Sequence, residues 1–448
     1  CAGSACRARW RWSRRSGASD LPADRGQQEA PKHNFAHLCE SLIRRTSCRS
    51  GSSLVFHNFY SPLPLLPVVL IALAVAHRLA RHDSGALSTQ RYASIDGLRG
   101  FLALFVFIHH ASIWWRYAHD GQWVAPTSRL YNHLGQDSVA LFFMVTAFLF
   151  TGQVLDSAKS RFDWPRFAWT RLFRLMPVYL LSMALLFVLV AFTSQGMRQT
   201  SWLSLLRGTG AWLMLGVAGT PDLNDVAGTW ILNAGVVWSL PYEVLFYAAL
   251  PLLAWLLGRR PGGRVVLFSV VMLLVMRSGW HPHSIHVKTF LGGIAAAFLA
   301  RSRWQPRLAA STTASAMVVL MLALAIRLDH TAFSTGPLIA LGIAFCILAC
   351  GNDLWGGLTH PASIALGKLT YSMYLLHGLV LYAALHFLVT PERMRGLEVW
   401  QYWGIILGLT PVVVGVSHLS TRLVEQPAQA FGRRWRQRES TAPSGHLA

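Results

Sequence analysis

Residues 92–115, YASIDGLRGFLALFVFIHHASIWW, decide the fold. This run is apolar over the length of about 20 residues that a helix needs to cross the hydrocarbon core of a bilayer. Ser94 or Asp96 can cap the start of the helix. His109 and His110 lie inside the apolar run, where ionisable groups are costly unless they face a cavity or a polar partner. They are therefore candidates for a functional site, and the alternative is a structural pair bonded to neighbouring helices.

Arg99 precedes His110 by eleven positions, which is close to three whole turns of an α-helix. The two side chains therefore share one helix face, about 16 Å apart along the axis, whereas His109 points about 100° away from His110. We expect Arg99 near the cytoplasmic surface. It is either a ligand for an anion or an Arg whose charged end reaches the membrane interface.

The same apolar character recurs along the chain. Of the 448 residues, 53% are hydrophobic and 13% are charged, whereas a soluble domain carries about 25% charge. Blocks of spanning length lie at 62–79, 98–116, 136–155, 175–193, 238–257, 265–280, 286–300, 311–327, 334–350, 368–390 and 400–419. We predict an all-α fold, a polytopic transmembrane helix bundle of about ten core helices plus one extra N-terminal helix. Gly208, Gly210 and Arg207 interrupt a weaker block at 202–218, which predicts a re-entrant or interfacial helix.

The formal net charge is +21, and the basic residues gather in short loops between the apolar blocks. Cytoplasmic loops of membrane proteins carry such an excess of Lys and Arg. The pattern places both ends of the ten-helix core on the cytoplasmic side and makes the lipid bilayer a partner. We exclude nucleic acid as a partner, because no nucleic-acid motif occurs and the aromatic residues lie in the spans.

Composition divides the chain into four parts. Residues 1–55 are rich in Arg, Ser and Gly and lack apolar periodicity, so we interpret them as disordered or as foreign to the natural protein. Residues 56–91 hold the extra helix and a linker, residues 92–431 the transmembrane domain, and residues 432–448 a basic cytoplasmic tail. No metal-ligand spacing is visible, and we predict neither a metal site nor a tightly bound cofactor.

Six blocks of the chain resemble, in order, the motifs of one family. They are IDGLRGFLALFVFIHHA at 95–111, SVALFFMVTAFLF at 138–150, RFAWTRLFRLMPVYLL at 166–181, WSLPYEVLFY at 238–247, LGKLTYSMYLLHG at 366–378 and LVEQPAQAF at 423–431. The family is acyltransferase family 3, the integral-membrane bacterial O-acyltransferases that modify cell-surface sugars. Its signature, an Arg, ten residues and a His, is matched by Arg99 and His110. The resemblance implies ten helices and a place in the cell inner membrane.

The chain departs from the family pattern at several positions. Ala140 stands where the family has Asp, and Thr146 and Ala147 replace a Ser-Gly pair. Pro241 and Val244 differ within the fourth block. We expect these departures to alter helix packing or acceptor binding more than the chemistry.

The resemblance implies transfer of an acyl group, expected to be acetyl, from acyl-CoA to a hydroxyl of a cell-surface carbohydrate or glycoside. Such a transfer needs a base to take the hydroxyl proton, and a His suits that role because it titrates near neutral pH. We assign the base to His110 and expect Arg99 and Glu243 to assist catalysis. CoA carries phosphates that match the planar fork of an Arg, so Arg99, Arg171 and Arg174 are expected to hold the donor.

Four residues are candidates for binding the carbohydrate acceptor: Trp238, Glu243, Tyr247 and His377. Glu243 can orient a sugar or pair with an Arg. Trp238 can stack on a sugar face or anchor its helix at the membrane interface. His377 lies within a span, where a structural hydrogen bond explains it as well as a role in catalysis does.

Two other functions fit the same composition. A helix bundle with interior His and Glu could be a proton-coupled transporter, or an exporter of a glycan precursor. A non-catalytic assembly subunit would tolerate the loss of His110. The six ordered blocks and the lack of an inverted repeat in the sequence favour the acyltransferase.

Overall fold

The computed structural model describes residues 59–81, 92–157 and 162–441, with the backbone alone for residues 435–441. This part of the chain is helical and holds no β-strand. The prediction for residues 1–55 lies outside the described residues, as does the end of the predicted tail. The described part of the tail is helical up to Thr441.

Six helical segments in the described residues are long and apolar enough to cross a membrane. They contain α3 (Ala93–Asp120), α4 (Arg129–Asp156), α5 (Trp164–Thr193), α7 (Leu240–Leu256), α14 (Thr370–Tyr382) with η4 (Ala383–Val389), and α16 (Val399–Ser420). Shorter helices are α2 (Leu65–Arg81), α8 (Gly263–Gly279), α9 (Ser284–Leu299), α11 (Thr312–Leu328) and α12 (Thr335–Ala349). Each predicted span coincides with one of these helices, which confirms a multi-pass helix bundle.

Short elements connect the long ones. They are α6 (Trp202–Leu213), η2 (Thr229–Asn233), η3 (Val236–Ser239), α10 (Gln305–Ala310), α13 (Pro361–Lys368), α15 (Pro391–Met394) and η5 (Thr421–Glu425). The last helix of the described chain is α17 (Gln426–Thr441). With 12 residues, α6 is shorter than the roughly 17 residues a bilayer requires. Its side chains Trp202, Leu203 and Leu206 are exposed. This geometry agrees with the interfacial helix predicted at 202–218.

The glycines of the first motif bring α3 into backbone contact with α13 and with the segment just before it. A Cβ on Gly97 would overlap the carbonyl oxygen of Leu358, and a Cβ on Gly100 would overlap the backbone at Gly367. Small residues let helix backbones in a membrane approach this closely. The contact fixes the first turns of α3, and with them the position of Arg99.

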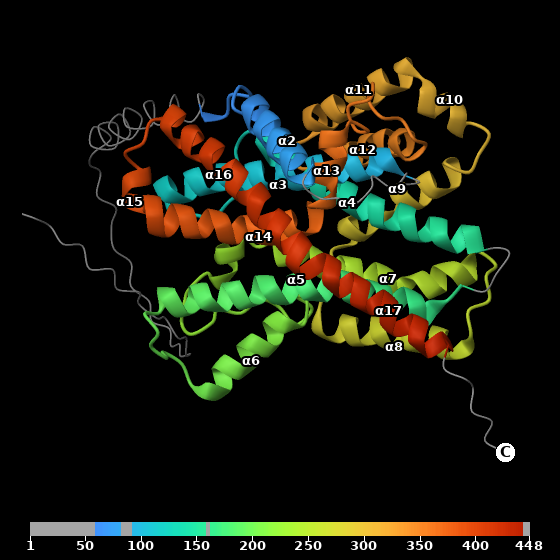
Figure 1. The fold of residues 1–448 in the computed structure, drawn as a ribbon, viewed down its shortest axis with the longest axis horizontal. Helices are drawn as coiled ribbons and strands as arrows, with labels where there is room; N and C mark the ends of the chain where they lie inside the picture. Colours follow the sequence, from blue (N-terminus) through green and yellow to red (C-terminus); the bar gives the residue numbers. More distant parts are fainter. Residues whose placement is uncertain (1–58, 82–91, 158–161, 442–448) are drawn as a thin grey trace, which may run out of the picture. The chain divides into compact units, whose positions relative to one another are not determined.

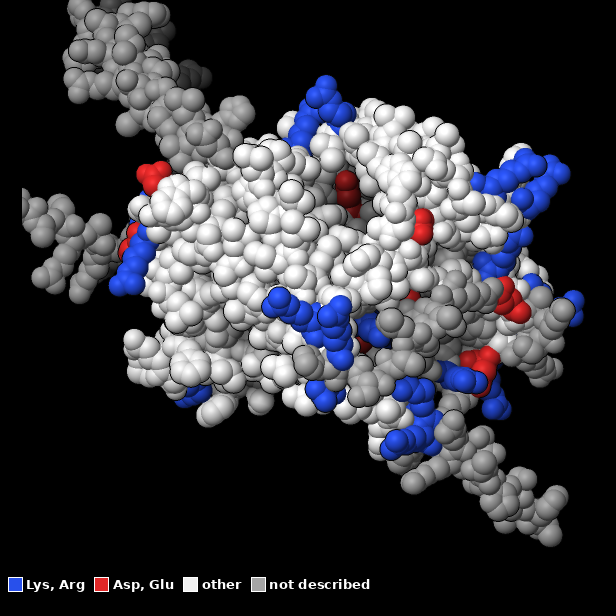
Figure 2. Space-filling model, turned by 45° about the horizontal axis from the view of Figure 1, so that its top comes forward, with Lys and Arg blue, Asp and Glu red and all other residues white. Residues whose placement is uncertain are grey.

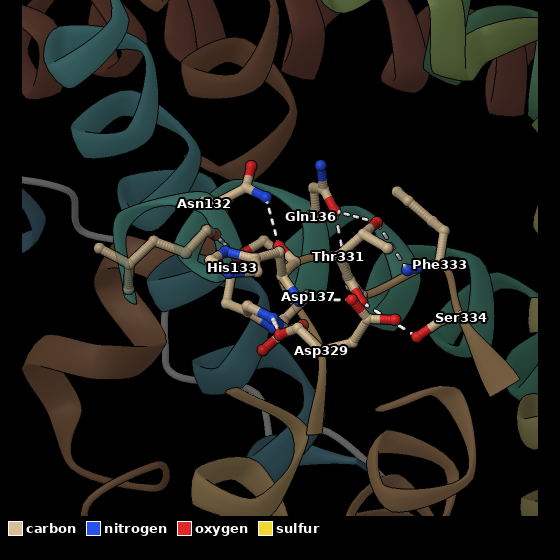
Figure 3. A network of polar contacts seen from close by, with 12 residues as sticks. Asn132, His133, Gln136, Asp137, Asp329, Thr331, Phe333 and Ser334 are labelled. Atoms are coloured by element: carbon tan, nitrogen blue, oxygen red, sulfur yellow. Dashed lines mark hydrogen bonds and ion pairs between the residues drawn. The ribbon is translucent and has the colours of Figure 1, made fainter. Parts of the chain in front are cut away.

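A polar network joins the first turns of α4 to the loop between α11 and α12 (Figure 3). Nδ1 of His133 lies 2.8 Å from Oδ1 of Asp137, and Nε2 of His133 lies 3.0 Å from the carbonyl oxygen of Asp329. Oε1 of Gln136 accepts a hydrogen bond of 2.7 Å from the hydroxyl of Thr331. Because these groups satisfy one another, we interpret the network as a structural clamp.

The C-terminal helices α16, η5 and α17 run on as one long rod across the bundle (Figure 1). The α17 helix packs on α5, where Nε1 of Trp169 donates a 3.2 Å hydrogen bond to the carbonyl oxygen of Gly432. Gly432 lies so close to Phe173 that a Cβ there would displace the ring. The last motif of the chain therefore lies beside the Arg-rich start of α5.

One face of the bundle is largely uncharged. Figure 2 shows few acidic or basic side chains over most of this face, and the basic side chains on it form separate clusters. Large apolar side chains on several spans are exposed, among them Val188, Phe268 and Ile339. Such helix surfaces suit the hydrocarbon layer of a bilayer.

Candidate active site

His110 on α3 bonds directly to His377 on α14. Nδ1 of His110 lies 3.0 Å from Nε2 of His377, and Nδ1 of His377 lies 2.9 Å from the carbonyl oxygen of Met373. A carbonyl oxygen only accepts, so Nδ1 of His377 carries a proton, and Nε2 of neutral His377 is an acceptor. Nδ1 of His110 must then be the donor. This pattern assigns the tautomer of His110 whose Nε2 has a free lone pair.

His109 has a different setting from His110. Its Nδ1 lies 2.8 Å from the carbonyl oxygen of Tyr131, and its ring packs so tightly on Gly135 that a Cβ there would overlap it. The side chain is buried. His109 therefore joins α3 to α4. Of the two histidines, it is the one with a structural hydrogen bond to a neighbouring helix backbone.

His110 faces a cavity of about 300 Å³ that we call the aromatic cavity. Its lining residues are His110, Trp123, Trp212, Thr220, Trp230, Asn233, Ala234, Gly235, Val237 and Trp238. Four of these are Trp, and the lining contains no Lys, Arg, Asp or Glu. An uncharged ligand with apolar faces and hydroxyl groups fits such a lining, because aromatic side chains supply contact area and a few polar groups fix orientation.

A second cavity, of about 320 Å³, lies near the start of α3, and we call it the arginine cavity. Its charged lining residues are Arg99, Arg171, Arg174, Arg433 and Glu243. Four Arg against one Glu make it strongly electropositive. The start of α3, the end of α4 and the start of α5 contribute to its wall, so the cavity lies on the side of the bundle where α4 ends and α5 begins.

The arginines of this cavity differ in how firmly they are held. Nη1 of Arg99 has a long contact of 3.5 Å with Oδ1 of Asp96, and 20% of the Arg99 side chain is exposed. Nη1 of Arg174 lies 3.3 Å from Oε1 of buried Glu425. Nε of Arg171 has no hydrogen-bond partner among the described residues. Arg99 and Arg171 therefore retain donors for an anionic ligand, whereas Arg174 is partly committed to Glu425.

Glu243 lies in the arginine cavity, one turn into α7, and accepts a hydrogen bond from the hydroxyl of Tyr247. The structure thus places Glu243 with Arg99 and Arg171, away from the aromatic cavity that contains His110. The roles of Glu243 in catalysis and in acceptor binding stay predictions, as does the alternative of an ion pair with an Arg.

The segment η3 stands between the two cavities. Ser239 and Tyr374 line the arginine cavity, whereas Trp238 lines the aromatic cavity. Oγ of Ser239 lies 2.7 Å from the hydroxyl of Tyr374, which donates a 3.2 Å hydrogen bond to the carbonyl oxygen of Val236. A ligand that extends from the arginine cavity to His110 has to pass this hydrogen-bonded wall.

A family model described as an acyltransferase domain matches residues 92–422, which is most of the chain. The chain belongs to acyltransferase family 3. This acyltransferase is therefore a membrane enzyme that transfers acyl groups other than aminoacyl groups. Comparisons with curated proteins and with solved structures gave no match.

In this acyltransferase the predicted site residues form two groups. Trp238 lines the aromatic cavity together with His110. His377 is buried and accepts the hydrogen bond from Nδ1 of His110. The other predicted residues, Arg99, Arg171, Arg174, Glu243 and Tyr247, all line the arginine cavity. The described part of the chain holds no group of three or more His, Cys, Asp or Glu side chains able to bind a metal ion.

Several lining residues of the acyltransferase were not singled out from the sequence. Ser239 and Tyr374 lie inside two of the quoted motifs, and Tyr374 precedes His377 by three positions, which places both on one helix face. That spacing could have indicated Tyr374 as a neighbour of His377 in the site. Asn233 and Trp123 lie outside the spans, in a 3₁₀ segment and a loop, where no periodic pattern identifies them.

Proposed function

We propose that this acyltransferase moves an acyl group, acetyl in the first instance, from acyl-CoA to a hydroxyl of a cell-surface carbohydrate or glycoside, with His110 as the general base. The observation that carries the proposal is the hydrogen bond between His110 and His377. It supports a neutral His110 with a free Nε2 on a ring that lines the aromatic cavity. A base must be neutral and within reach of the acceptor hydroxyl, and this arrangement favours both conditions.

The arginine cavity is the proposed site of acyl-CoA. Phosphate groups bind well to the planar fork of Arg, and Arg99 and Arg171 each keep donors for such contacts. The positive-inside distribution of the loops favours a cytoplasmic location for this cavity, where acyl-CoA is made. We assign the protein to the cell inner membrane on the same grounds.

The aromatic cavity is the proposed site of the acceptor. The faces of a pyranose ring that carry C–H groups are apolar and fit against Trp, and its hydroxyls require only a few polar partners. Trp230 and Trp238 are 36% and 40% exposed, so a ligand can reach both from outside the bundle. An uncharged lining favours a neutral sugar over a uronic acid or a sugar phosphate.

In the proposed reaction, the acyl thioester of a CoA bound in the arginine cavity extends past the wall of Ser239 and Tyr374 to the acceptor beside His110. The acceptor oxygen attacks the thioester carbonyl carbon while Nε2 of His110 takes the hydroxyl proton. The tetrahedral intermediate collapses, the C–S bond breaks, and the proton passes from His110 to the departing sulfur. The products are the sugar ester and CoA thiol, and His110 is neutral again.

Replacement of His110 tests this proposal. We expect His110→Ala to abolish acylation of surface glycans, read by mass spectrometry, while the protein still accumulates in the membrane. The matched control is His109→Asn, which removes the adjacent imidazole but keeps a donor for the carbonyl oxygen of Tyr131. Full acylation by His110→Ala would contradict the role of His110, and loss in both variants at equal amounts of protein would point to a packing effect.

A further inference from the structure

Asn233, the last residue of η2, has its side-chain amide oriented by a backbone hydrogen bond. Oδ1 accepts a 3.0 Å hydrogen bond from the amide of Gly235, which identifies the other terminal atom as the nitrogen. The residue is 0% exposed. Nδ2 has no hydrogen-bond partner among the described residues. The amide oxygen of Asn233 thus stabilises the local turn, whereas its two N–H groups make no hydrogen bond among the described residues.

Buried donors without partners are rare in folded proteins and tend to occur where a ligand or a reacting atom completes them. Asn233 lines the aromatic cavity together with His110. Of the described residues with an unpartnered buried side-chain atom, Asn233 is the one that lines this cavity. The residue that carries the free donor therefore lines the cavity proposed as the site of reaction.

Packing connects Asn233 to the histidine pair. Gly378 follows His377 on α14, and a Cβ on Gly378 would overlap the backbone carbonyl of Asn233. The missing side chain lets η2 lie directly on α14, beside the residue that supports His110. One helix thus positions both His110, through His377, and Asn233.

We propose that Nδ2 of Asn233 is the oxyanion donor of the transfer reaction, an inference that rests on the proposed function. When the acceptor oxygen bonds to the thioester carbon, the π electrons of the carbonyl move to its oxygen. Asn233 donates a hydrogen bond to that negative oxygen while His110 holds the acceptor proton. As the C–S bond breaks, the electrons return to form the ester carbonyl, and the proton of His110 passes to sulfur.

This assignment gives the site two groups that act on different atoms. His110 accepts the hydroxyl proton and later donates it to sulfur. Asn233 stabilises the negative charge on the carbonyl oxygen, which exists only in the transition state and the intermediate. The uncharged lining of the aromatic cavity strengthens such a hydrogen bond, since few competing dipoles or ions surround it. Donors of this kind contribute mainly to kcat, because they bind the reacting oxygen more tightly than the ground-state carbonyl.

Two substitutions separate the chemical role from a structural one. Asn233→Asp keeps an oxygen for the amide of Gly235 but removes the N–H groups, whereas Asn233→Ala removes both. We expect both variants to lower kcat by roughly 100- to 1,000-fold with little change in the KM for acceptor, as for other oxyanion donors. The assay uses the full-length enzyme in detergent, with acetyl-CoA as donor and simple glycosides as acceptors. Binding of CoA, measured by calorimetry, should be unchanged and reports the folded state.

Each outcome is decisive. Recovery of kcat by Asn233→Asp to near the parent value would assign Asn233 to turn formation alone and overturn the inference. An increase in the acceptor KM with kcat retained would assign Asn233 to sugar binding and also overturn it. Loss of transfer in His110→Ala together with normal kcat in both Asn233 variants would leave the proposed function standing without the oxyanion role. Retained transfer in His110→Ala would instead contradict the proposed function.

Discussion

Nδ1 of His110 lies 3.0 Å from Nε2 of His377, although 267 positions separate the two residues in the sequence. In other acyl-transfer enzymes, a buried hydrogen-bond acceptor supports the catalytic His by selecting its tautomer and orientation, and the relation here is similar. In this protein the hydrogen-bond acceptor is a second imidazole, which itself donates a hydrogen bond to the carbonyl oxygen of Met373. His377 is accordingly a positioning residue in the proposed mechanism.

His377→Phe should lower kcat by up to the full contribution of a general base, about 100- to 10,000-fold. The ring fills the same space but accepts no hydrogen bond, so the tautomer of His110 is no longer selected. His377→Gln offers an amide oxygen to His110 and should recover part of the rate. The pH profile of kcat in the Gln variant should shift, since the partner of His110 has changed. Equal rates for the Phe variant and the parent enzyme would exclude this positioning role.

Arg99→Ala should raise the KM for acyl-CoA more than it lowers kcat. Arg99 has a single long contact with Asp96, so its remaining N–H groups are available to a phosphate. Arg99→Lys should recover only part of the affinity, because an ammonium group lacks the fork geometry. Calorimetric titration with CoA measures both variants, and an unchanged Kd in Arg99→Ala would refute donor binding by this residue.

Arg174→Ala should destabilise the fold as well as weaken donor binding. Removal of Arg174 leaves Glu425, which is 3% exposed, without its cationic partner. Breaking a buried ion pair from one side costs about 3–5 kcal/mol, and less here because Arg174 is itself 28% exposed. Adding Glu425→Gln should recover thermal stability but not CoA affinity. A double-mutant cycle of Tm values checks this, and additive losses would show that the two side chains are not coupled.

Gly97→Ala should disturb the contact between α3 and the segment that precedes α13. A Cβ at this position would overlap the carbonyl oxygen of Leu358, and overpacking of this kind costs about 1–3 kcal/mol. The matched control is Gly404→Ala in α16, where a Cβ meets no atom within 4 Å. That change should leave stability unchanged or raise it by up to about 1 kcal/mol through helix propensity. Tm in detergent measures both, and a stable Gly97→Ala variant would contradict the close crossing.

Much of the fold could be predicted because a membrane imposes a length and a composition on every span. The blocks at 98–116 and 136–155 coincide with α3 and α4 for this reason. The interrupted block at 202–218 corresponds to the short helix α6. The helical period likewise predicts that Arg99 and His110 share a face. Both residues line cavities, Arg99 near the start of α3 and His110 in its middle.

The partners of these residues could not be predicted, because contacts between helices depend on crossing positions that no single span encodes. No sequence pattern indicated that Glu243 lines the same cavity as Arg99 and Arg171. The contact of Arg174 with Glu425 from the last motif likewise carried no sequence signal, and the role of Arg174 in donor binding stays a prediction. Asn233 carried no signal because a 3₁₀ segment of five residues has no amphipathic pattern.

The sequence by itself determined the class of the protein, the family, the approximate spans and the shared face of Arg99 and His110, since apolar length, motif order and helical period are local properties of the chain. Only the tertiary structure decided that His377 selects the tautomer of His110, that Glu243 lies with the arginines, and that Asn233 lines the aromatic cavity. These relations join residues far apart in the chain. They depend on glycines such as Gly367 and Gly378, which let the backbones of neighbouring helices come into contact at fixed positions along each helix.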